Sequence, residues 1–253
     1  MILDMVRLMY IFSLIFFTSS NPLITSKKTE KKTVVNNVKK SFSPIEQMYH
    51  DMHLDSILKF EAFEQALQGR NLLSLDNKDT ITVIDFSLPS TEKRLYVLDL
   101  RNKKMLFHSL VSHGRNSGEK FATAFSNRTN SYQSSLGFYE TEATYQGGNG
   151  YSLVLNGLEA GINDHAKSRA VVIHGADYCS EKIISSTGRL GRSYGCPALP
   201  RELNKPIINT IKDGTLLYIY ADNKEYASQS QILNNDRTLL AQKDIGEDKE
   251  HLN

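Results

Sequence analysis

The sequence predicts a mainly β domain with flanking helices, arranged as a sandwich or barrel with long loops. Six short β-rich runs recur along the middle of the chain, with turn residues between them. Long stretches rich in Ser, Thr, Asn and Gly separate the later runs, and helical patterns are confined to two places. Many short strands, few helices and long loops are typical of sandwiches and barrels.

The composition excludes several other classes of protein. The 253 residues are 40% hydrophobic and 23% charged, with 15 Gly and 6 Pro, which rules out full-length disorder, collagen and coiled coil. Lys and Arg number 30 against 28 Asp and Glu, for a net charge of +2. So small an excess argues against a nucleic-acid-binding protein. Two cysteines are too few for a disulfide framework.

The first residues have the layout of a secretory signal peptide. Arg7 precedes the apolar run Leu8–Phe17, and three small polar residues follow. The run is about ten residues long, roughly half of what a spanning helix needs. We therefore expect a signal peptide over residues 1–20, secretion to the periplasm or cell envelope, and no stable membrane span after cleavage. An uncleaved anchor and an unused N-terminal tail are the alternatives.

Residues 21–42 are predicted to be a polar linker. The lysine-rich stretch 26–40 has neither a helical nor a strand period, so a solvated connection is the simplest interpretation. Attraction to an anionic membrane or wall surface is the functional alternative.

A folded domain is expected over residues 43–221, and it begins with helices. Ser43 supplies a capping side chain, followed by Pro44 and, two residues further, the acid Glu46, which together are typical of a helix start. Apolar residues then follow helical spacing, and Gly69 is a candidate helix end. We therefore predict one or two short helices over Ser43–Gly69.

The strands and a late helix follow. The predicted strands are Thr80–Phe86, Arg94–Leu100, Met105–Ser112, Tyr151–Leu155, Ala170–Ile173 and Thr215–Tyr220. A helix is predicted over Lys205–Lys212, with Pro206 in its first turn. Residues 222–253 are polar and are expected to form a loosely attached tail.

The densest cluster of chemically capable residues lies between residues 171 and 200. An apolar strand ends at His174, and a glycine-rich turn later leads through Gly195 to Cys196. A cysteine nucleophile needs a base, because the thiolate attacks and a free thiol has a pKa of about 8.5. It also needs backbone N–H groups for the developing oxyanion. His174 is the candidate base, and the turn at Gly195, which lacks a Cβ, is the candidate oxyanion site.

This segment resembles the catalytic segment of YkuD-like L,D-transpeptidases, enzymes that remodel bacterial peptidoglycan. The hallmark of that family is His-Gly at a strand end, a spacer, and then Ser-(His)-Gly-Cys. The matching residues here are His174, Gly175, Ser193, Gly195 and Cys196.

Two departures point to a divergent branch, a murein L,D-transpeptidase catalytic domain family. Tyr194 stands where His is common, and the spacer is slightly longer than usual. The stretch Gly188–Ser193 and the segment Ser134–Tyr139 resemble the same branch, and the similarity covers roughly Ser43–Tyr220. Tyr194 therefore affects what is expected of substrate contact more than what is expected of the nucleophile.

The resemblance implies an L,D-transpeptidase-like β fold and a two-step acyl transfer without a cofactor or metal. Cys196 would attack the carbonyl on the L-centre of the diamino acid in a peptidoglycan stem tetrapeptide, and His174 would protonate the departing D-alanine. The side-chain amine of a second stem would then resolve the thioester. With water as acceptor, the same site would be an L,D-carboxypeptidase. The alternative from another class is a non-catalytic peptidoglycan-binding module, and the oligomeric state is left open.

Several further residues are candidates for substrate binding, each with a structural alternative. Arg189 and Arg192 suit planar contacts with a substrate carboxylate. Tyr194 is a candidate for the pocket wall, and Gly175 follows the proposed base. His113 directly follows its own predicted strand and is the remaining histidine candidate. Ser193 is expected to hydrogen-bond within the turn.

The second cysteine is predicted to be a bystander. Cys179 lies in the same segment as Cys196, and in an oxidising compartment the two thiols could pair. Pairing would disable the nucleophile, so we expect Cys179 to be a small buried apolar residue.

Two other enzyme classes have weaker patterns in the chain. The Ser-x-x-Lys signature of serine acyl enzymes occurs three times but no Lys-Thr-Gly follows; the matches are Ser56–Lys59, Ser90–Lys93 and Ser117–Lys120. A metal hydrolase would use His113, His174 and Cys196 as ligands, but neither His-Glu-x-x-His nor Cys-x-x-Cys is present in the sequence.

Overall fold

The computed structural model describes residues 42–235, and the elements and side chains below belong to this range. The predicted signal peptide and the predicted linker up to residue 41 lie outside the described residues, as does the predicted tail beyond residue 235. None of the described helices is long and apolar enough to cross a membrane.

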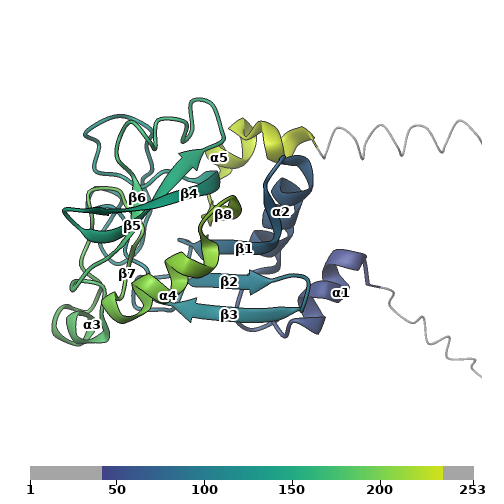
Figure 1. The fold of residues 1–253 in the computed structure, drawn as a ribbon, viewed down its shortest axis with the longest axis horizontal. Coiled ribbons are helices and arrows are strands. Elements are labelled where there is room, and N and C mark those ends of the chain that lie inside the picture. Colours follow the sequence, from purple (N-terminus) through teal and green to yellow (C-terminus); the bar gives the residue numbers. More distant parts are fainter. Residues whose placement is uncertain (1–41, 236–253) are drawn as a thin grey trace, which may run out of the picture. The chain divides into compact units, whose positions relative to one another are not determined.

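The strands form one eight-stranded sheet in the order β3-β2-β1-β8-β4-β5-β6-β7 (Figure 1). Their bounds are β1 (Asn77–Asp85), β2 (Leu95–Asp99), β3 (Lys104–Ser109), β4 (Gly137–Gly147), β5 (Gly150–Gly157), β6 (Val172–Gly175), β7 (Ala198–Leu199) and β8 (Thr215–Tyr220). β1 pairs with β8 and β6 with β7 in parallel, and the other neighbours are antiparallel.

The two edges of this sheet approach each other and nearly close it. Ser112, just beyond edge strand β3, forms an antiparallel bridge with Ala198 of edge strand β7. Gly114 forms a parallel bridge with Ser193, close to the same place. The predicted class, mainly β with a sandwich or barrel arrangement and long loops, is therefore confirmed in the form of a barrel-like sheet.

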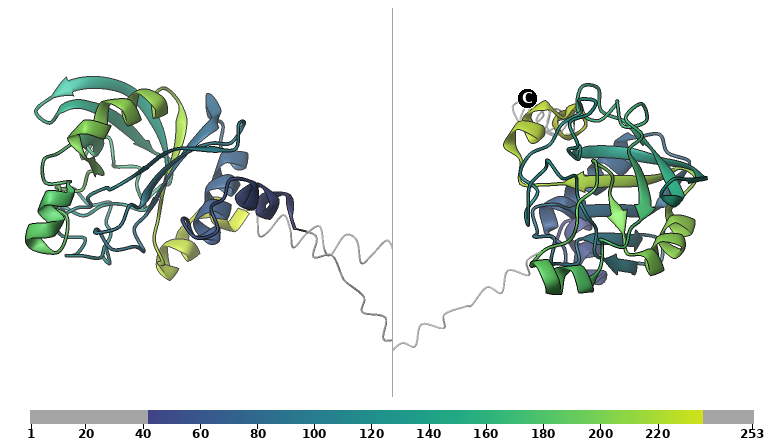
Figure 2. Two further views of the ribbon diagram at one scale, coloured as in Figure 1. Left: turned by 90° about the horizontal axis from the view of Figure 1, so that it is seen from below. Right: turned by 90° about the vertical axis from the view of Figure 1, so that its left-hand side faces the viewer.

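Five helices surround the strands in the described range: α1 (Pro44–Asp51), α2 (Phe60–Leu72), α3 (Glu181–Thr187), α4 (Arg201–Ile211) and α5 (Lys224–Gln229). Figures 1 and 2 place α3 at one end of the domain, with α1 and α2 at the other. The predicted helix start is confirmed, because Ser43 and Glu46 form a reciprocal capping box.

The prediction that Gly69 ends the first helical segment is wrong, since α2 continues to Leu72. Gly69 lies instead where α2 packs on the sheet. A Cβ at this position would lie 2.2 Å from a ring carbon of Phe138 in β4. The glycine therefore permits close packing rather than a left-handed helix end.

Other boundaries also differ from the prediction. α4 begins at Arg201, so Pro206 lies inside the helix rather than in its first turn. The six predicted strands are all present, but β4 and β7 were not predicted, and neither were α3 and α5.

The C-terminal helix α5 is packed on the domain, contrary to the expectation of a loosely attached segment from Asp222. Tyr226 of α5 is 6% exposed, and its hydroxyl donates to the buried Glu159 carboxylate at 3.1 Å. Ser230 is also buried and donates to Glu159. The same carboxylate accepts from the backbone N–H of Phe138 at 2.9 Å, so Glu159 joins this segment to β4.

Candidate active site

Cys196 and His174 lie on neighbouring segments of the sheet edge. His174 of β6 is the parallel partner of Ala198 in β7, two residues beyond Cys196. Continuing the register places Cys196 beside Val172, and the Val172 N–H does point at the Cys196 sulfur, 3.5 Å away. The pairing of β6 with β7 therefore brings together the two residues that the sequence nominated.

His174 is held in one tautomer by its own strand. His174 is 4% exposed, and its Nδ1 lies 3.1 Å from the Gly175 carbonyl oxygen. A carbonyl only accepts hydrogen bonds, so Nδ1 carries the proton and Nε2 keeps its lone pair. Burial, with a smaller contribution from the positive charge of Arg201, lowers the pKa of His174 below its ordinary value. His174 is therefore neutral near pH 7, as a general base must be.

Cys196 is partly exposed and in the thiol form. Its sulfur donates to the Ala170 carbonyl at 3.6 Å and accepts the Val172 N–H. Burial raises the pKa of the Cys196 thiol above its ordinary value, while the Val172 N–H and the charge of Arg169 act in the opposite direction. Among the described residues no hydrogen bond joins this sulfur to the His174 ring, and such contacts often tighten only when substrate binds.

The turn before Cys196 is fixed by internal hydrogen bonds. The Ser193 hydroxyl donates to the Cys196 carbonyl at 2.6 Å and accepts the Gly195 N–H at 3.0 Å. Gly195 has a φ of 128°, a conformation that side chains rarely adopt. The Gly195 N–H thus points inward, which leaves the Cys196 N–H as the candidate oxyanion donor of this turn.

Arg169 belongs to the site, although sequence reasoning did not nominate it. Its guanidinium donates to four oxygen atoms of one loop, residues 126–135, which we call the strap; the acceptors are those of Ser126, Ser131, Gln133 and Ser135. The charge of Arg169 acts on the Cys196 thiol. One feature of the sequence could have indicated Arg169: it lies directly before the predicted strand that leads to His174.

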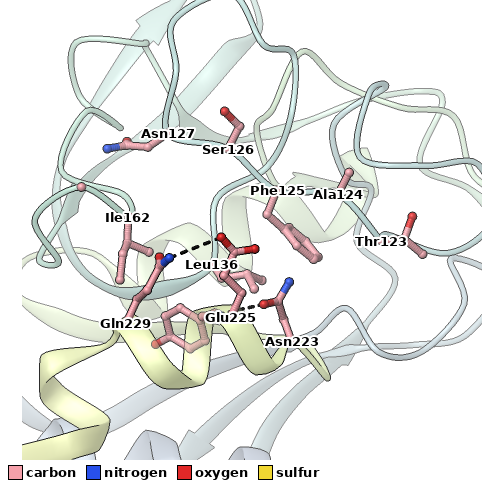
Figure 3. Close-up of a pocket in the computed structure, with 12 residues that line it drawn as sticks. Thr123, Ala124, Phe125, Ser126, Asn127, Leu136, Ile162, Asn223, Glu225 and Gln229 are labelled. Carbon is pink, nitrogen blue, oxygen red and sulfur yellow. Dashed lines mark hydrogen bonds between the residues drawn. The ribbon is translucent and has the colours of Figure 1, made fainter.

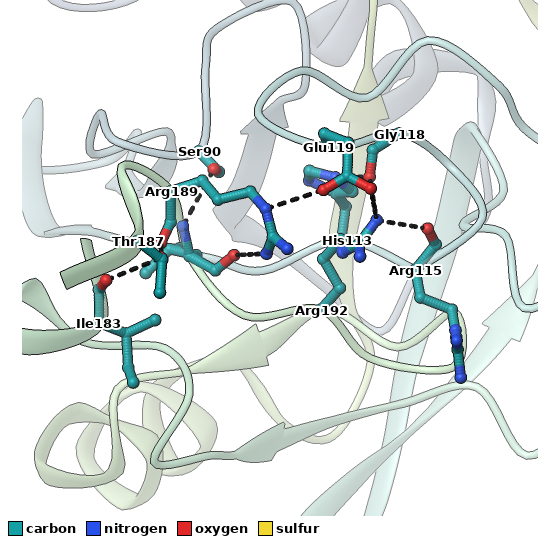
Figure 4. A network of polar contacts seen from close by, with 10 residues as sticks. Ser90, His113, Arg115, Gly118, Glu119, Ile183, Thr187, Arg189 and Arg192 are labelled. Carbon is teal, nitrogen blue, oxygen red and sulfur yellow. Dashed lines mark hydrogen bonds and ion pairs between the residues drawn. The ribbon is translucent and has the colours of Figure 1, made fainter.

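Arg189 and Arg192 share one carboxylate rather than facing the site unpaired (Figure 4). Glu119 accepts from Arg189 at 2.9 Å and from Arg192 at 2.7 Å. Arg192 also donates to the carbonyl groups of Arg115 and Gly118. The charges of both arginines are therefore already paired within the protein.

His113 is 1% exposed and has no ring nitrogen to spare. Its Nδ1 accepts from Arg94 at 2.8 Å, and its Nε2 lies 3.2 Å from the Gly118 carbonyl. Burial and the neighbouring Arg94 lower the pKa of His113 to about 4. This geometry supports the structural alternative for His113, and it engages the nitrogens that a metal would need.

The remaining nominated residues lie around the turn. Tyr194 is 67% exposed and packs against Tyr132 of the strap, with ring centroids 4.9 Å apart. Gly175 is buried, and a Cβ there would lie 3.0 Å from Asn204 of α4. Tyr194 is thus available to a ligand, whereas Gly175 serves helix packing.

Cys179 is fully buried in a small apolar cluster with Leu110 and Leu190. Both cysteines are free thiols. Burial raises the pKa of Cys179 to about 12, so this thiol is unreactive at neutral pH.

A separate cavity of about 300 Å³ lies between α5 and the loop that carries Phe125 (Figure 3). None of the nominated site residues lines it, and its walls hold neither a histidine nor a cysteine. Within residues 42–235, no group of three or more His, Cys, Asp or Glu side chains is placed to hold a metal ion.

The chain belongs to the L,D-transpeptidase catalytic domain family, whose model matches residues 54–220. This match includes His174 and Cys196 and confirms the resemblance seen in the sequence. No curated protein matches.

Solved structures similar to this chain include L,D-transpeptidases. One is an LD transpeptidase in complex with imipenem (14% identity, 56% of this chain and 59% of that chain, TM-score 0.35). Another is from Mycobacterium smegmatis (13%, 56% and 59%, TM-score 0.35). A third is from Stackebrandtia nassauensis (14%, 71% and 77%, TM-score 0.35). This chain spans 59% of the length of each of the first two. The TM-scores are low, so the family assignment is based on the family model that matches residues 54–220.

Proposed function

We propose that this protein is a cysteine acyltransferase of the cell envelope that forms L,D cross-links between peptidoglycan stem peptides. The observation that carries the proposal is the β6–β7 pairing, which sets Cys196 beside the strand of His174. His174 supports the role because its Nδ1 is anchored and its Nε2 faces no competing donor in the described structure. The signal-like residues 1–20 support secretion to the periplasm or envelope.

The proposed first step is acylation. His174 Nε2 takes the Cys196 proton, and the sulfur attacks the carbonyl on the L-centre of the diamino acid. The bond to D-alanine breaks, and the His174 imidazolium gives its proton to the departing amine. The Cys196 N–H supports the transient oxyanion.

The proposed second step is deacylation. The side-chain amine of another stem attacks the thioester, loses a proton to His174, and forms the cross-link as the sulfur leaves. The proton on His174 returns to the Cys196 sulfur and restores the resting thiol. If water attacks instead, the thioester is hydrolysed and the enzyme acts as an L,D-carboxypeptidase.

The test is incubation of the purified protein with a stem tetrapeptide that ends in meso-diamino acid and D-alanine. We expect D-alanine release, an acyl adduct on Cys196 by mass spectrometry, and a dimeric product when an amine acceptor is present. A hydrolysed tripeptide without dimer would assign the carboxypeptidase outcome. Neither D-alanine nor adduct would mean that the proposal is wrong.

The two cysteines provide a matched pair of variants. Cys196→Ala is expected to abolish D-alanine release, because the nucleophile is removed. Cys179→Ala is expected to retain most of the activity, because Cys179 is enclosed among Leu110 and Leu190. Equal losses in two variants that remain folded would contradict the assignment of Cys196 as nucleophile.

A further inference from the structure

Next to the Cys196 turn lies an exposed cluster of Arg115, Tyr132 and Tyr194, which we call the Arg115 cluster. Tyr132 is 40% and Tyr194 67% exposed, and their rings are tilted against each other. The Arg115 guanidinium lies over the Tyr194 ring, 5.9 Å from its centroid. Such exposure of two large aromatic side chains beside a cation is typical of ligand-binding surfaces.

The backbone of this cluster is fixed to the turn that carries the nucleophile. The Arg115 N–H donates to the Ser193 carbonyl at 2.8 Å, beside the bridge from Gly114 to Ser193. The Arg115 carbonyl accepts from Arg192 at 2.9 Å. Tyr194 itself is two residues before Cys196. The backbone of Arg115 is therefore held at a defined place beside the turn that carries Cys196.

Tyr132 is held in place at a cost in backbone energy. Its φ is 55°, a left-handed conformation that costs a side-chain-bearing residue about 1–2 kcal/mol. The Asn116 N–H donates to the Tyr132 carbonyl at 3.1 Å, and Arg169 binds the strap on both sides of Tyr132, at Ser131 and Gln133. Strained residues of this kind concentrate at functional sites.

The charge of Arg115 is available, in contrast to that of its neighbours. Glu119 pairs with both Arg189 and Arg192, whereas Figure 4 shows the Arg115 side chain directed away from Glu119. Among the described residues no carboxylate lies within ion-pair distance of the Arg115 guanidinium. The cluster thus offers a planar cation next to two apolar ring faces.

We propose that Arg115, rather than Arg189 or Arg192, binds a carboxylate of the donor stem peptide, with Tyr132 and Tyr194 packing on the adjoining aliphatic part. This inference rests on the proposed function. A guanidinium suits a carboxylate because it presents two parallel donors. Two carboxylates of the stem flank the bond that is cleaved and are the candidates, one on the terminal D-alanine and one on the side chain of the diamino acid.

The experiment compares Arg115→Gln with Arg128→Gln, an exposed arginine of the strap that serves as the control. Four tetrapeptides are used: the meso-diamino acid peptide, its side-chain amide, its L-lysine analogue and its C-terminal D-alaninamide. Arg115→Gln is expected to raise KM about tenfold with kcat changed little, while Arg128→Gln matches the wild type. Wild type and Arg115→Gln are expected to have the same KM for a peptide that lacks the recognised carboxylate. Equal KM values for the D-alaninamide identify the C-terminal carboxylate, and equal KM values for the side-chain amide and the L-lysine analogue identify that of the diamino acid. An equal loss on all four peptides would overturn the proposal.

Binding without turnover separates this inference from the proposed function. The Cys196→Ala variant is titrated with the meso-diamino acid tetrapeptide by calorimetry, with and without Arg115→Gln. A roughly tenfold weaker Kd in the double variant supports the Arg115 cluster even if the wild type releases no D-alanine. An unchanged Kd, or no binding to Cys196→Ala at all, overturns it.

Discussion

Arg169 links the strap to Cys196, because its guanidinium binds four oxygens of residues 126–135 and its charge acts on the Cys196 thiol. Burial raises the pKa of the Cys196 thiol, and Arg169 opposes that effect. Arg169→Met is therefore expected to raise the pKa of Cys196 further. Each added unit lowers the thiolate fraction about tenfold below the pKa. The measurement is the rate of Cys196 alkylation by iodoacetamide from pH 6 to pH 10, followed by mass spectrometry.

Arg169→Lys separates charge from hydrogen bonding at the same position. A lysine keeps the positive charge but cannot reproduce the fork of the guanidinium. We expect its alkylation profile to stay near that of the wild type, while its midpoint of thermal unfolding falls as in Arg169→Met. If both variants shift the profile equally, the charge of Arg169 does not act on the thiol.

In the site, the sequence indicated the residues that lie in one short motif and missed those that come from distant loops. His174 and Cys196 were nominated because a strand end and a glycine-rich turn are visible locally. Arg169 acts through the strap, which is remote in sequence. The neutralisation of Arg189 and Arg192 depends on Glu119, about seventy residues earlier, and such pairings are set by the fold alone.

At the scale of elements, helix propensity and packing have opposite effects at Gly69 of α2. Ala is about 1 kcal/mol more favourable than Gly inside a helix. A Cβ at position 69, however, would meet the Phe138 ring at 2.2 Å, and that ring is stacked on Tyr218 at 4.3 Å. Gly69→Ala is therefore expected to lower the free energy of unfolding by about 1–3 kcal/mol, as overpacking does.

Chemical denaturation of Gly69→Ala provides the measurement, and Asn71→Ala is its control on the same helix. Asn71 is exposed, so its replacement tests propensity without packing and is expected to be neutral or slightly stabilising. Should Gly69→Ala stabilise the protein, the close approach of α2 to Phe138 would be disproved.

The elements that the sequence missed have weak local patterns. β4 carries Glu and Thr residues between its aromatic residues, and its second half is largely exposed. β7 has two residues, and it is defined by its parallel pairing with β6. α5 was expected to belong to a polar tail because its sequence is polar. Tyr226 is its buried residue. In each case tertiary contacts, rather than local preference, decide the structure.

Glu159 is the contact that holds α5 to β4. Its carboxylate accepts from Phe138, Tyr226 and Ser230, and it is 5% exposed. Glu159→Ala leaves these buried donors without their acceptor, at an expected cost of about 2–4 kcal/mol in the free energy of unfolding. Tyr226→Phe removes one hydrogen bond and is expected to cost about 1 kcal/mol. Urea denaturation measures both, and a smaller loss in Glu159→Ala than in Tyr226→Phe would contradict this account.

At the scale of the whole molecule, strand order could not be obtained from local patterns. β1 and β8 are parallel neighbours in the sheet but lie at opposite ends of the domain sequence. The two edges of the sheet meet through the bridge between Ser112 and Ala198. This contact places the turn that contains Cys196 beside the loop that follows β3. The sequence therefore predicted the class and most strands, while the site depends on pairings of high sequence separation.

The buried pair of Arg94 and His113 beside this closure makes global stability depend on pH. The folded protein keeps His113 neutral with a pKa of about 4, lowered from 6.5 by burial and by Arg94, so only the unfolded chain takes up this proton between these values. The free energy of unfolding should therefore fall by about 3 kcal/mol from pH 6.5 to pH 4 through this residue.

His113→Gln keeps one acceptor for Arg94 and one donor for Gly118 but cannot titrate. The difference in free energy of unfolding between wild type and His113→Gln, measured by denaturant at several pH values, isolates His113 from other titrating groups. A difference that stays constant from pH 7 to pH 4 would show that His113 is not held neutral.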